Sequence, residues 1–320
     1  MNIVLKALIV FGVVMLVGRL VFKLVNQPSF SSDARARHVV VISVDALRAE
    51  DFTYFKTLPN FSDLIANGSM INEVNSVYPS LTYPAHTTIV TGVYPDKHGI
   101  ISNTPNQPGV KDPDWYWYYR DIKSPTLFDY ARKSKMTVGT LFWPVTAGAP
   151  VNYNLPEIWP NKPGQSQVGL VLKNGTPLFI LDVDIRFGKM LDGKKEPNLD
   201  NFTAASAAHM IKSRKPNLAF IHLTDLDHFQ HSNGVDSKEA RAALKRQDER
   251  LGEIVRAVKE AGLYGDTAFG VLGDHGAIDT QYNININTAF VNAGLITLDK
   301  KGGVSEWKVN ANSCDGSTHI

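Results

Sequence analysis

The chain has 320 residues, and 43% of them are hydrophobic, which is enough for a well-buried core and excludes a disordered or fibrous protein. Its 33 basic and 31 acidic residues nearly cancel, so no overall electric field would draw the molecule onto nucleic acid or an anionic membrane. A single cysteine, Cys314, excludes an internal disulfide framework. Any bound nucleotide must therefore be held by a local site.

The N-terminal segment, residues 1–25, is largely apolar but is interrupted by basic residues. Its longest uninterrupted stretch, 7–18, is short for a full membrane span, but flanking charged side chains can extend to the interface, so we interpret the segment as a signal-anchor. A cleaved signal peptide is the alternative, although no convincing small-x-small cleavage site lies between residues 18 and 32. The two interpretations predict a cell-membrane protein with an extracytoplasmic domain, or a secreted one. Polar residues 26–37 then form a linker to a folded domain at 38–320.

Three continuous apolar runs are typical of strands that are buried on both faces. They are residues 38–44, followed by Asp45; residues 217–223, followed by Thr224-Asp225-Leu226-Asp227; and residues 267–272, followed by Gly273-Asp274-His275-Gly276. In an open α/β sheet, the carboxyl ends of such strands meet at the edge where sites are built. We therefore expect these polar residues to lie close together.

Helix-like segments alternate with the apolar runs, at residues 58–67, 126–135, 201–215 and 237–261. This alternation predicts an α/β fold with a mostly parallel sheet and helices on both faces. Two stretches rich in proline, residues 104–121 and 144–175, are expected to form long loops or small inserts over the site.

Residues 78–92 are expected to form a loop that leads into a helix, with Pro84 in the first turn and Gly92 at the end. Thr82 then lies at the helix N-terminus, where free backbone N–H groups and the helix dipole favour a bound phosphate. The alternative is that Thr82 is an ordinary N-cap residue.

Carboxylates and imidazoles follow the predicted strands, namely Asp45, Asp227, His231, Asp274 and His275. Zn²⁺ accepts this mixed ligand set, whereas Mg²⁺ and Ca²⁺ prefer oxygen ligands alone. Asp227 and His231 are four residues apart, so a helical turn would direct both at one ion, and Asp274 and His275 could diverge toward two ions. Two zinc ions about 4 Å apart would clamp the attacking and leaving oxygens of an in-line displacement. Each Asp–His pair taken alone is more often a satisfied polar loop.

Five motifs occur in order along the chain. They are Val44-Asp45, Tyr78-Pro79-Ser80-x-Thr82-x-Pro84-x-His86, Gly92-x-Tyr94-Pro95-x-x-His98-Gly99-Ile100-x-x-Asn103, Asp227-x-x-x-His231-x-x-Gly234 and Gly273-Asp274-His275-Gly276. In this combination the chain resembles the type I phosphodiesterase/nucleotide pyrophosphatase family of the alkaline phosphatase superfamily. The resemblance implies an alkaline-phosphatase-like three-layer sandwich. It also implies hydrolysis of phosphodiester or pyrophosphate bonds in small, nucleotide-like substrates through a phosphothreonine intermediate.

The resemblance further implies two divalent metal ions, which in this family are Zn²⁺. The first would be held by Asp45, Thr82, Asp274 and His275, with Thr82 also acting as the nucleophile. The second would be held by Asp227, His231 and a histidine of a late His-Gly motif. His319 is the only late histidine, but Ile320 follows it in place of glycine, so we expect the third ligand beyond residue 320 and a catalytic domain truncated at its C-terminus.

Substrate contacts are implied for three further positions. Asn103 matches an asparagine whose amide donates to a phosphoryl oxygen, and Tyr83 matches an aromatic residue that stacks on the leaving nucleoside. His222 stands at the opposite stacking position, where nucleotide-specific relatives commonly have tyrosine, and this departure weakens the nucleotide prediction. A phosphomonoesterase of the same superfamily and a metal-poor, membrane-tethered binding protein are the alternatives.

Overall fold

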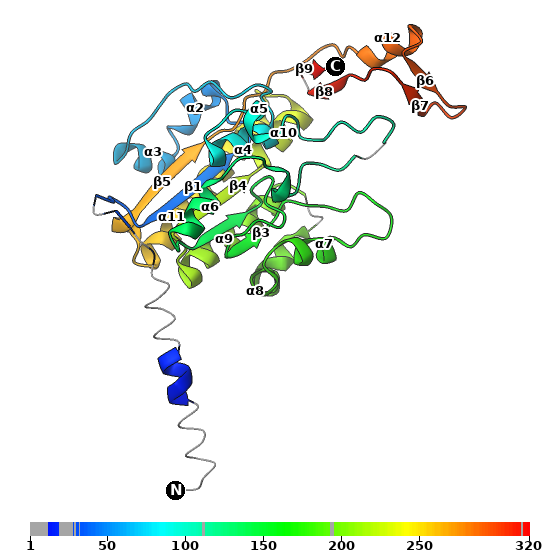
Figure 1. Cartoon of the computed structure of the whole chain (residues 1–320). Helices are drawn as coiled ribbons and strands as arrows, with labels where there is room; N and C mark the ends of the chain where they lie inside the picture. The colour runs from blue at the N-terminus through cyan, green and yellow to red at the C-terminus, as the bar shows by residue number, and fades with distance from the viewer. Residues whose placement is uncertain are drawn as a thin grey trace.

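A five-stranded parallel sheet forms the centre of the fold (Figure 1), with the strand order β3-β2-β4-β1-β5. The computed structural model of the chain describes residues 12–18, 28, 30–31, 33–110, 113–192, 195–314 and 316–320. The strands are β1 (His38–Val44), β2 (Val138–Leu141), β3 (Tyr153–Leu155), β4 (Leu218–Leu223) and β5 (Thr267–Leu272). The predicted α/β class and parallel sheet are confirmed.

The three strands predicted from apolar runs are β1, β4 and β5, and they are neighbours in the sheet. In their register, Ser43 of β1 lies opposite His222 of β4 and Leu272 of β5. The three strands therefore end side by side, and the polar residues that follow them meet at one edge. β2 and β3 are short and were not predicted; β3 lies within the proline-rich region 144–175.

Helices cover both faces of this sheet (Figure 1). Because side chains alternate along a strand, Val40, Ile42 and Val44 of β1 point to one face and Val41 points to the other. The first face packs against α2 (Ala49–Phe55), α3 (Pro59–Ala66), α8 (Pro177–Phe187), α9 (Asn198–Arg214) and α11 (Lys238–Glu260). The second face packs against α4 (Thr82–Thr91) and α6 (Leu127–Lys133). A three-layer arrangement results.

Local capping explains where several of the predicted helices begin. The side chain of Thr126 accepts a hydrogen bond from the backbone N–H of Asp129 and starts α6, and Ser237 caps α11 in the same way. These starts agree with the predicted segments. The helix predicted at residues 201–215 begins earlier, at Asn198, and ends at Arg214, where Lys215 caps it with a left-handed backbone and φ of 50°.

Further helices and strands extend this layered core, and Leu226 of the helix that follows β4 is buried within it. These further segments are α5 (Pro95–His98), α7 (Gln167–Asn174), α10 (Asp225–Asn233), α12 (Ile286–Asn292), β6 (Ile296–Leu298), β7 (Val304–Trp307), β8 (Asn312–Cys314) and β9 (Ser317–His319). Pairs β6–β7 and β8–β9 are antiparallel, and Figure 1 shows them, orange to red, to one side of the main sheet.

Part of the N-terminal segment is described as a helix at residues 12–18, and the rest of 1–25 lies outside the described residues. Among the described residues, no helix is both long and apolar enough to cross a membrane.

Candidate metal-dependent active site

The carboxyl edge of the sheet brings Asp45 and Asp274 together. The backbone N–H of Asp45 donates to the carbonyl of Leu223 (2.9 Å), and Ala46 then turns the chain with φ of 57°. Ala46 in turn donates its N–H to Oδ1 of Asp274 (3.1 Å). Glycine at position 273 permits this approach, since a Cβ there would lie 2.6 Å from the carbonyl oxygen of Leu47. Both carboxylates are thus held side by side in the interior.

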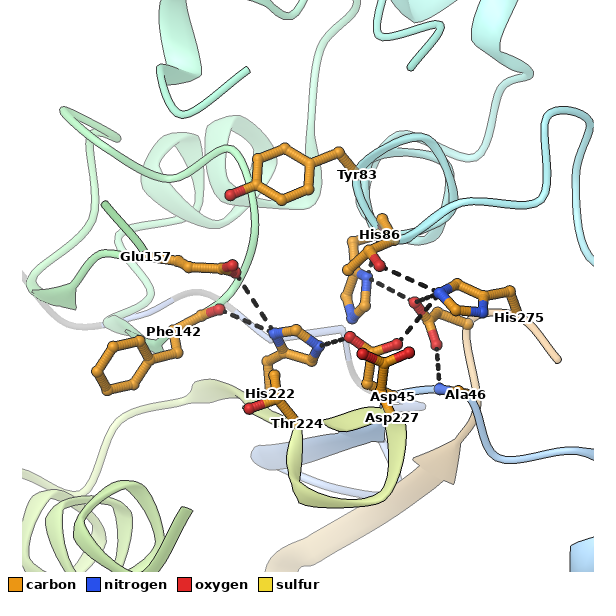
Figure 2. Close-up of polar contacts among 12 residues, drawn as sticks. Asp45, Ala46, Tyr83, His86, Phe142, Glu157, His222, Thr224, Asp227 and His275 are labelled. Atoms are coloured by element: carbon orange, nitrogen blue, oxygen red, sulfur yellow. Dashed lines mark hydrogen bonds and ion pairs between the residues drawn. The ribbon is translucent and has the colours of Figure 1, made fainter. Parts of the chain in front are cut away.

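Three ligand atoms converge at this point (Figure 2). Nε2 of His275 lies 3.2 Å from Oδ1 of Asp45 and 3.5 Å from Oδ2 of Asp274. Among the described residues, neither of these buried carboxylate oxygens has a hydrogen-bond donor. Ligands about 2.0–2.1 Å from a tetrahedral zinc ion are about 3.3 Å apart, so the spacing fits one such ion. The predicted divergence of Asp274 and His275 toward two ions is wrong, because their ligand atoms converge.

The electrostatics of this cluster also favour a bound cation. Burial would raise the pKa of Asp45, but the hydrogen bond from His222 and the nearby imidazole of His275 lower it well below its usual value. Burial and the charge of Asp45 raise the pKa of Asp274 to about 7. Burial lowers the pKa of His275, but the charge of Asp274 and the contact with Asp45 outweigh it and raise the pKa to about 10. The two buried carboxylates are therefore stabilised by a nearby positive charge. A bound divalent ion would supply that charge and would displace the proton of His275.

A second contact orients the His275 ring. Its Nδ1 lies 3.0 Å from the carbonyl oxygen of Gly276. A proton on Nδ1 that is donated to this carbonyl leaves Nε2 free to ligate a metal, the usual outer contact of a metal-bound histidine.

Thr82 is the first residue of α4, and its side chain joins the cluster. Leu81 occupies the N-cap position, and Oγ1 of Thr82 lies 3.1 Å from Nε2 of His275. The structure therefore contradicts the alternative that Thr82 is an ordinary N-cap. His86, one turn later, contacts the Thr82 carbonyl through Nδ1 (2.8 Å), and the same nitrogen lies 3.4 Å from Oδ2 of Asp274. Gly92 ends the helix in a left-handed conformation, as predicted.

Asn103 lies against the same helix end. Its Oδ1 accepts the backbone N–H of Tyr83 (2.9 Å). This bond fixes the carboxamide, and its Nδ2 group has no hydrogen-bond acceptor within the described part of the chain. The two amide protons remain available for an oxygen of a bound phosphoryl group.

Asp227 and His231 form a second pair, on α10. The predicted helical turn is confirmed, and it places Nε2 of His231 3.2 Å from Oδ1 of Asp227. Burial, and then the nearby charge of Asp45, raise the pKa of Asp227, and Figure 2 shows the two carboxylates side by side. The side chain of His231 is 67% exposed and that of Asp227 is 23% exposed, so the histidine side of this pair faces solvent. His319, on β9, joins neither of the ligand clusters found among the described residues.

An ion network that was not anticipated from the sequence anchors the start of α10. Arg246 binds Asp225 through two hydrogen bonds of 2.7 and 2.9 Å, and Arg250 Nη1 lies 2.6 Å from the same carboxylate. Asp200 accepts the backbone N–H groups of Thr224 and Asp225 (2.9 and 3.0 Å). Glu196, Asp200 and Asp225 form a second carboxylate cluster, but guanidinium groups already occupy it, two of them on Asp225 and one also on Asp200. The one sequence feature that could have indicated this network is the spacing of Arg246 and Arg250, which are four residues apart and therefore lie on one face of α11.

The stacking roles expected for Tyr83 and His222 require correction. Tyr83 is fully buried and packs against Trp115, with 5.3 Å between the ring centroids. His222 lies on the central strand β4, and its side chain is fully buried against the carboxylate of Asp45. Neither ring reaches a surface on which a nucleobase could stack.

Three comparisons with known proteins agree on one family. The family model described as type I phosphodiesterase / nucleotide pyrophosphatase matches residues 39–319. Ectonucleotide pyrophosphatase/phosphodiesterase family member 1 of Homo sapiens is 27% identical over 266 residues, which cover 79% of this chain and 25% of that protein. Bis(5'-adenosyl)-triphosphatase ENPP4 of Bos taurus is 24% identical over 267 residues, covering 80% of this chain and 51% of that protein. The chain thus spans between a quarter and a half of these relatives' lengths.

Solved structures show the same fold. Murine ectonucleotide pyrophosphatase/phosphodiesterase 5 superposes with a TM-score of 0.57 at 22% identity, covering 82% of this chain and 63% of that one. The inactive threonine-to-alanine variant of the murine protein, in complex with AMP, superposes with the same TM-score at 21% identity and with the same coverage.

Proposed function

This chain belongs to the type I phosphodiesterase/nucleotide pyrophosphatase family, and on that premise we propose that it is a metal-dependent hydrolase of phosphodiester or pyrophosphate bonds. The observation that carries the proposal is the convergence of Thr82 Oγ1, Asp45 Oδ1 and Asp274 Oδ2 on Nε2 of His275. This hydroxyl lies at a helix N-terminus, near two carboxylate oxygens that accept no hydrogen bond from the described residues. It is therefore suited to nucleophilic attack at a cation-bound phosphoryl group.

The residues present fit one divalent cation and supply two ligands for a second, and their mixed carboxylate and imidazole ligands favour Zn²⁺. Asp45, Asp274, His275 and Thr82 would hold one, and Asp227 and His231 would contribute to the other. When bound, the cations lower the pKa of the attacking hydroxyl and of water and neutralise the phosphoryl oxygens.

The chain's own residues then perform a two-step displacement. Oγ1 of Thr82 loses its proton, attacks phosphorus and forms a phosphothreonine as the bond to the leaving oxygen breaks. Water later cleaves this ester, and Oγ1 regains a proton. The amide of Asn103 donates to a phosphoryl oxygen, and its contact with Tyr83 N–H holds that donor in place. His86 holds the backbone of Thr82 through its carbonyl.

Nucleotide-like compounds are the proposed substrates. Supporting this are the names of the relatives, which include a bis(5'-adenosyl)-triphosphatase, and the AMP complex of the murine threonine-to-alanine variant. The inactivity of that variant also supports a threonine nucleophile. Because Tyr83 and His222 are buried, a stacking surface would have to come from other aromatic residues, such as the partly buried Trp115 beside Tyr83.

The test is hydrolysis of p-nitrophenyl thymidine 5'-monophosphate and of p-nitrophenyl phosphate by the purified chain, before and after chelation and zinc addition. We expect turnover of the diester that is lost on chelation and restored by Zn²⁺. Faster turnover of the monoester would instead assign a phosphomonoesterase. Bound zinc without turnover of either compound would leave a binding protein or an incomplete second metal site.

The N-terminal segment extends the proposal to location. The apolar stretch 7–18 and the extracellular activity implied by the relatives' "ecto" names support an anchor with an extracytoplasmic domain. Flotation of the full chain with membranes, compared with a chain that starts at residue 38, tests this. Full-length protein that stays out of the membrane fraction would overturn the anchor, and a product found outside the cell without residues 1–25 would assign a cleaved signal.

A further inference from the structure

His222 occupies a buried position between three neighbouring strand ends. It lies near the end of β4, opposite Ser43 of β1. Its Nε2 lies 3.0 Å from Oδ2 of Asp45, and its Nδ1 lies 3.1 Å from the carbonyl oxygen of Phe142, directly after β2 (Figure 2). Both nitrogens of the ring therefore face oxygen atoms, one on each side. The ring's rotation is fixed by these two contacts together.

The contact with His222 divides the two oxygens of Asp45 between different tasks. Oδ2 is taken by His222, whereas Oδ1 has no hydrogen-bond donor among the described residues and faces Nε2 of His275 at 3.2 Å. A carboxylate held at one oxygen cannot rotate without losing that bond, so its other oxygen keeps one direction. We propose that His222 is a positioning residue that aims Oδ1 of Asp45 at the first cation. This inference rests on the metal site of the proposed function.

The surroundings of His222 are built to hold it and not to admit a substrate. Phe142 has a left-handed backbone with φ of 51°, which is costly for a residue with a Cβ, and its carbonyl faces the imidazole. The carboxylate of Glu157 lies 3.6 Å from Nδ1, and the ring of His86 lies 4.3 Å from the His222 ring, centroid to centroid. With its side chain fully buried, His222 acts on the reaction through its contact with Asp45 and not through contact with a substrate.

Two amide substitutions separate the two ring nitrogens. Glutamine can place its amide nitrogen near the position of Nε2 and still donate to Asp45. Asparagine reaches only the position of Nδ1, so it keeps the Phe142 carbonyl as a partner and leaves Oδ2 of Asp45 without its donor. Both variants carry the same amide group and differ by one methylene, so the difference between them is the reach of the amide and the bond to Asp45 that depends on it.

Zinc affinity of the first site is the measurement, made on the full chain by competition with a chromophoric chelator. An Asp227→Asn background removes a ligand of the second site, so that the first dominates. We expect His222→Gln to bind zinc within a few-fold of the parent and His222→Asn to bind at least about tenfold more weakly, the usual loss when an outer partner of a ligand is removed. Thermal unfolding of the metal-free proteins establishes that both variants fold.

A matched histidine–aspartate pair outside the site provides the control. Nε2 of His209 on α9 lies 2.9 Å from Oδ2 of Asp182 on α8, a geometry close to that of His222 and Asp45. His209→Asn should leave zinc affinity unchanged.

Equal zinc affinity in the asparagine and glutamine variants would overturn the positioning role. So would a higher KM for the nucleotide diester with unchanged zinc affinity, because that pattern belongs to a substrate contact. The two outcomes above would overturn the positioning role alone. A parent chain that binds no zinc at all would overturn both the proposed function and this inference, so the two kinds of failure can be told apart.

Discussion

Oγ1 of Thr82 lies 3.1 Å from Nε2 of His275, although 193 positions separate the two residues in the chain. The first belongs to the start of α4 and the second follows β5, so the contact depends on how helix and sheet pack. It places a hydroxyl beside the atom that, with Asp45 and Asp274, makes the first proposed metal site. Nucleophile and metal ligands therefore form one unit, which leads to the following predictions.

Replacing Thr82 by alanine should abolish turnover. The variant lacks the hydroxyl that attacks phosphorus in the proposed mechanism, so we expect a loss of at least about 10³-fold in kcat. Bound zinc, measured in the same sample, should remain, because Asp45, Asp274 and His275 are intact. Thr91→Ala, in the last turn of the same helix, should be almost fully active. Normal turnover in Thr82→Ala would refute the nucleophile assignment.

Asp274→Asn should remove one zinc ion per chain. Asparagine can still accept the N–H of Ala46 at the position of Oδ1 (3.1 Å in the native protein), but it directs an uncharged amide toward the site in place of Oδ2. Elemental analysis after dialysis would measure the loss. Asp266→Asn is the control, because Asp266 forms an exposed ion pair with Arg37 away from the site. An unchanged zinc content in Asp274→Asn would contradict the first site.

His231→Ala should remove the other zinc ion and leave the first in place. Since the side chain of His231 is 67% exposed, the metal-free variant should unfold at the same temperature as the native chain. His228→Ala is the matched control, an exposed histidine on the same helix whose ring lies against Phe229. If loss of His231 and loss of His228 affect zinc content equally, the second site is wrongly assigned.

Arg250→Met should destabilise the fold strongly. Arg250 is buried and binds Asp225, Asp200 and the carbonyl of Pro197, so its removal leaves two buried carboxylates short of a cation. We expect a loss of about 3–5 kcal/mol in the free energy of unfolding. Arg256→Met, an exposed substitution on the same helix, should change stability by less than about 0.5 kcal/mol. Urea denaturation of the metal-free proteins measures both.

Glu196 should make stability fall as pH rises. Burial, and then the charge of Asp200, raise its pKa from 4.5 to about 8 in the folded protein. Between those values the folded chain keeps a proton that the unfolded chain has lost, so this group's contribution to stability decreases with rising pH and is constant above about pH 8.

Glu196→Gln should remove that pH dependence. The glutamine carbonyl in this variant can still accept the hydrogen bond from Oγ1 of Thr224 (2.7 Å in the native protein). The contact with the N–H of Asp200 is weakened, but this effect is independent of pH. Between about pH 5 and pH 9, the variant should lose less unfolding free energy than the native chain, by on the order of 1 kcal/mol or more. Glu249→Gln, an exposed position on α11, should keep the native slope. Parallel slopes for all three proteins would disprove the assignment to Glu196.

Much of the fold and part of the site could be predicted from local patterns. The apolar runs that became β1 and β5 were located to the residue, because each is continuous and ends at a polar or glycine residue. The convergence of Asp45, Asp274 and His275 followed from the rule that parallel strands end at one edge, together with the family resemblance. β2 and β3 escaped prediction because strands of four and three residues carry too little periodicity.

Side-chain direction is where prediction from motifs was wrong. Tyr83 directly follows the proposed nucleophile, and His222 aligns with a stacking position, yet both rings point into the interior. Likewise no local pattern distinguishes Arg250 from the other charged residues of 237–261, whereas it lies on the buried face of α11 and binds both α10 and the start of α9.

The residue types and their order along the chain were sufficient to identify the family, the parallel sheet and the candidate ligands, because these depend on local periodicity and on which strand each residue follows. The packing of α4, α9 and α11 on the sheet decided which oxygen of Asp45 is free, which arginines are buried and which aromatic rings are inaccessible. Those outcomes depend on contacts between residues more than a hundred positions apart, such as Asp45 and His222. Their geometry is set by strand register and helix packing, which no local pattern encodes.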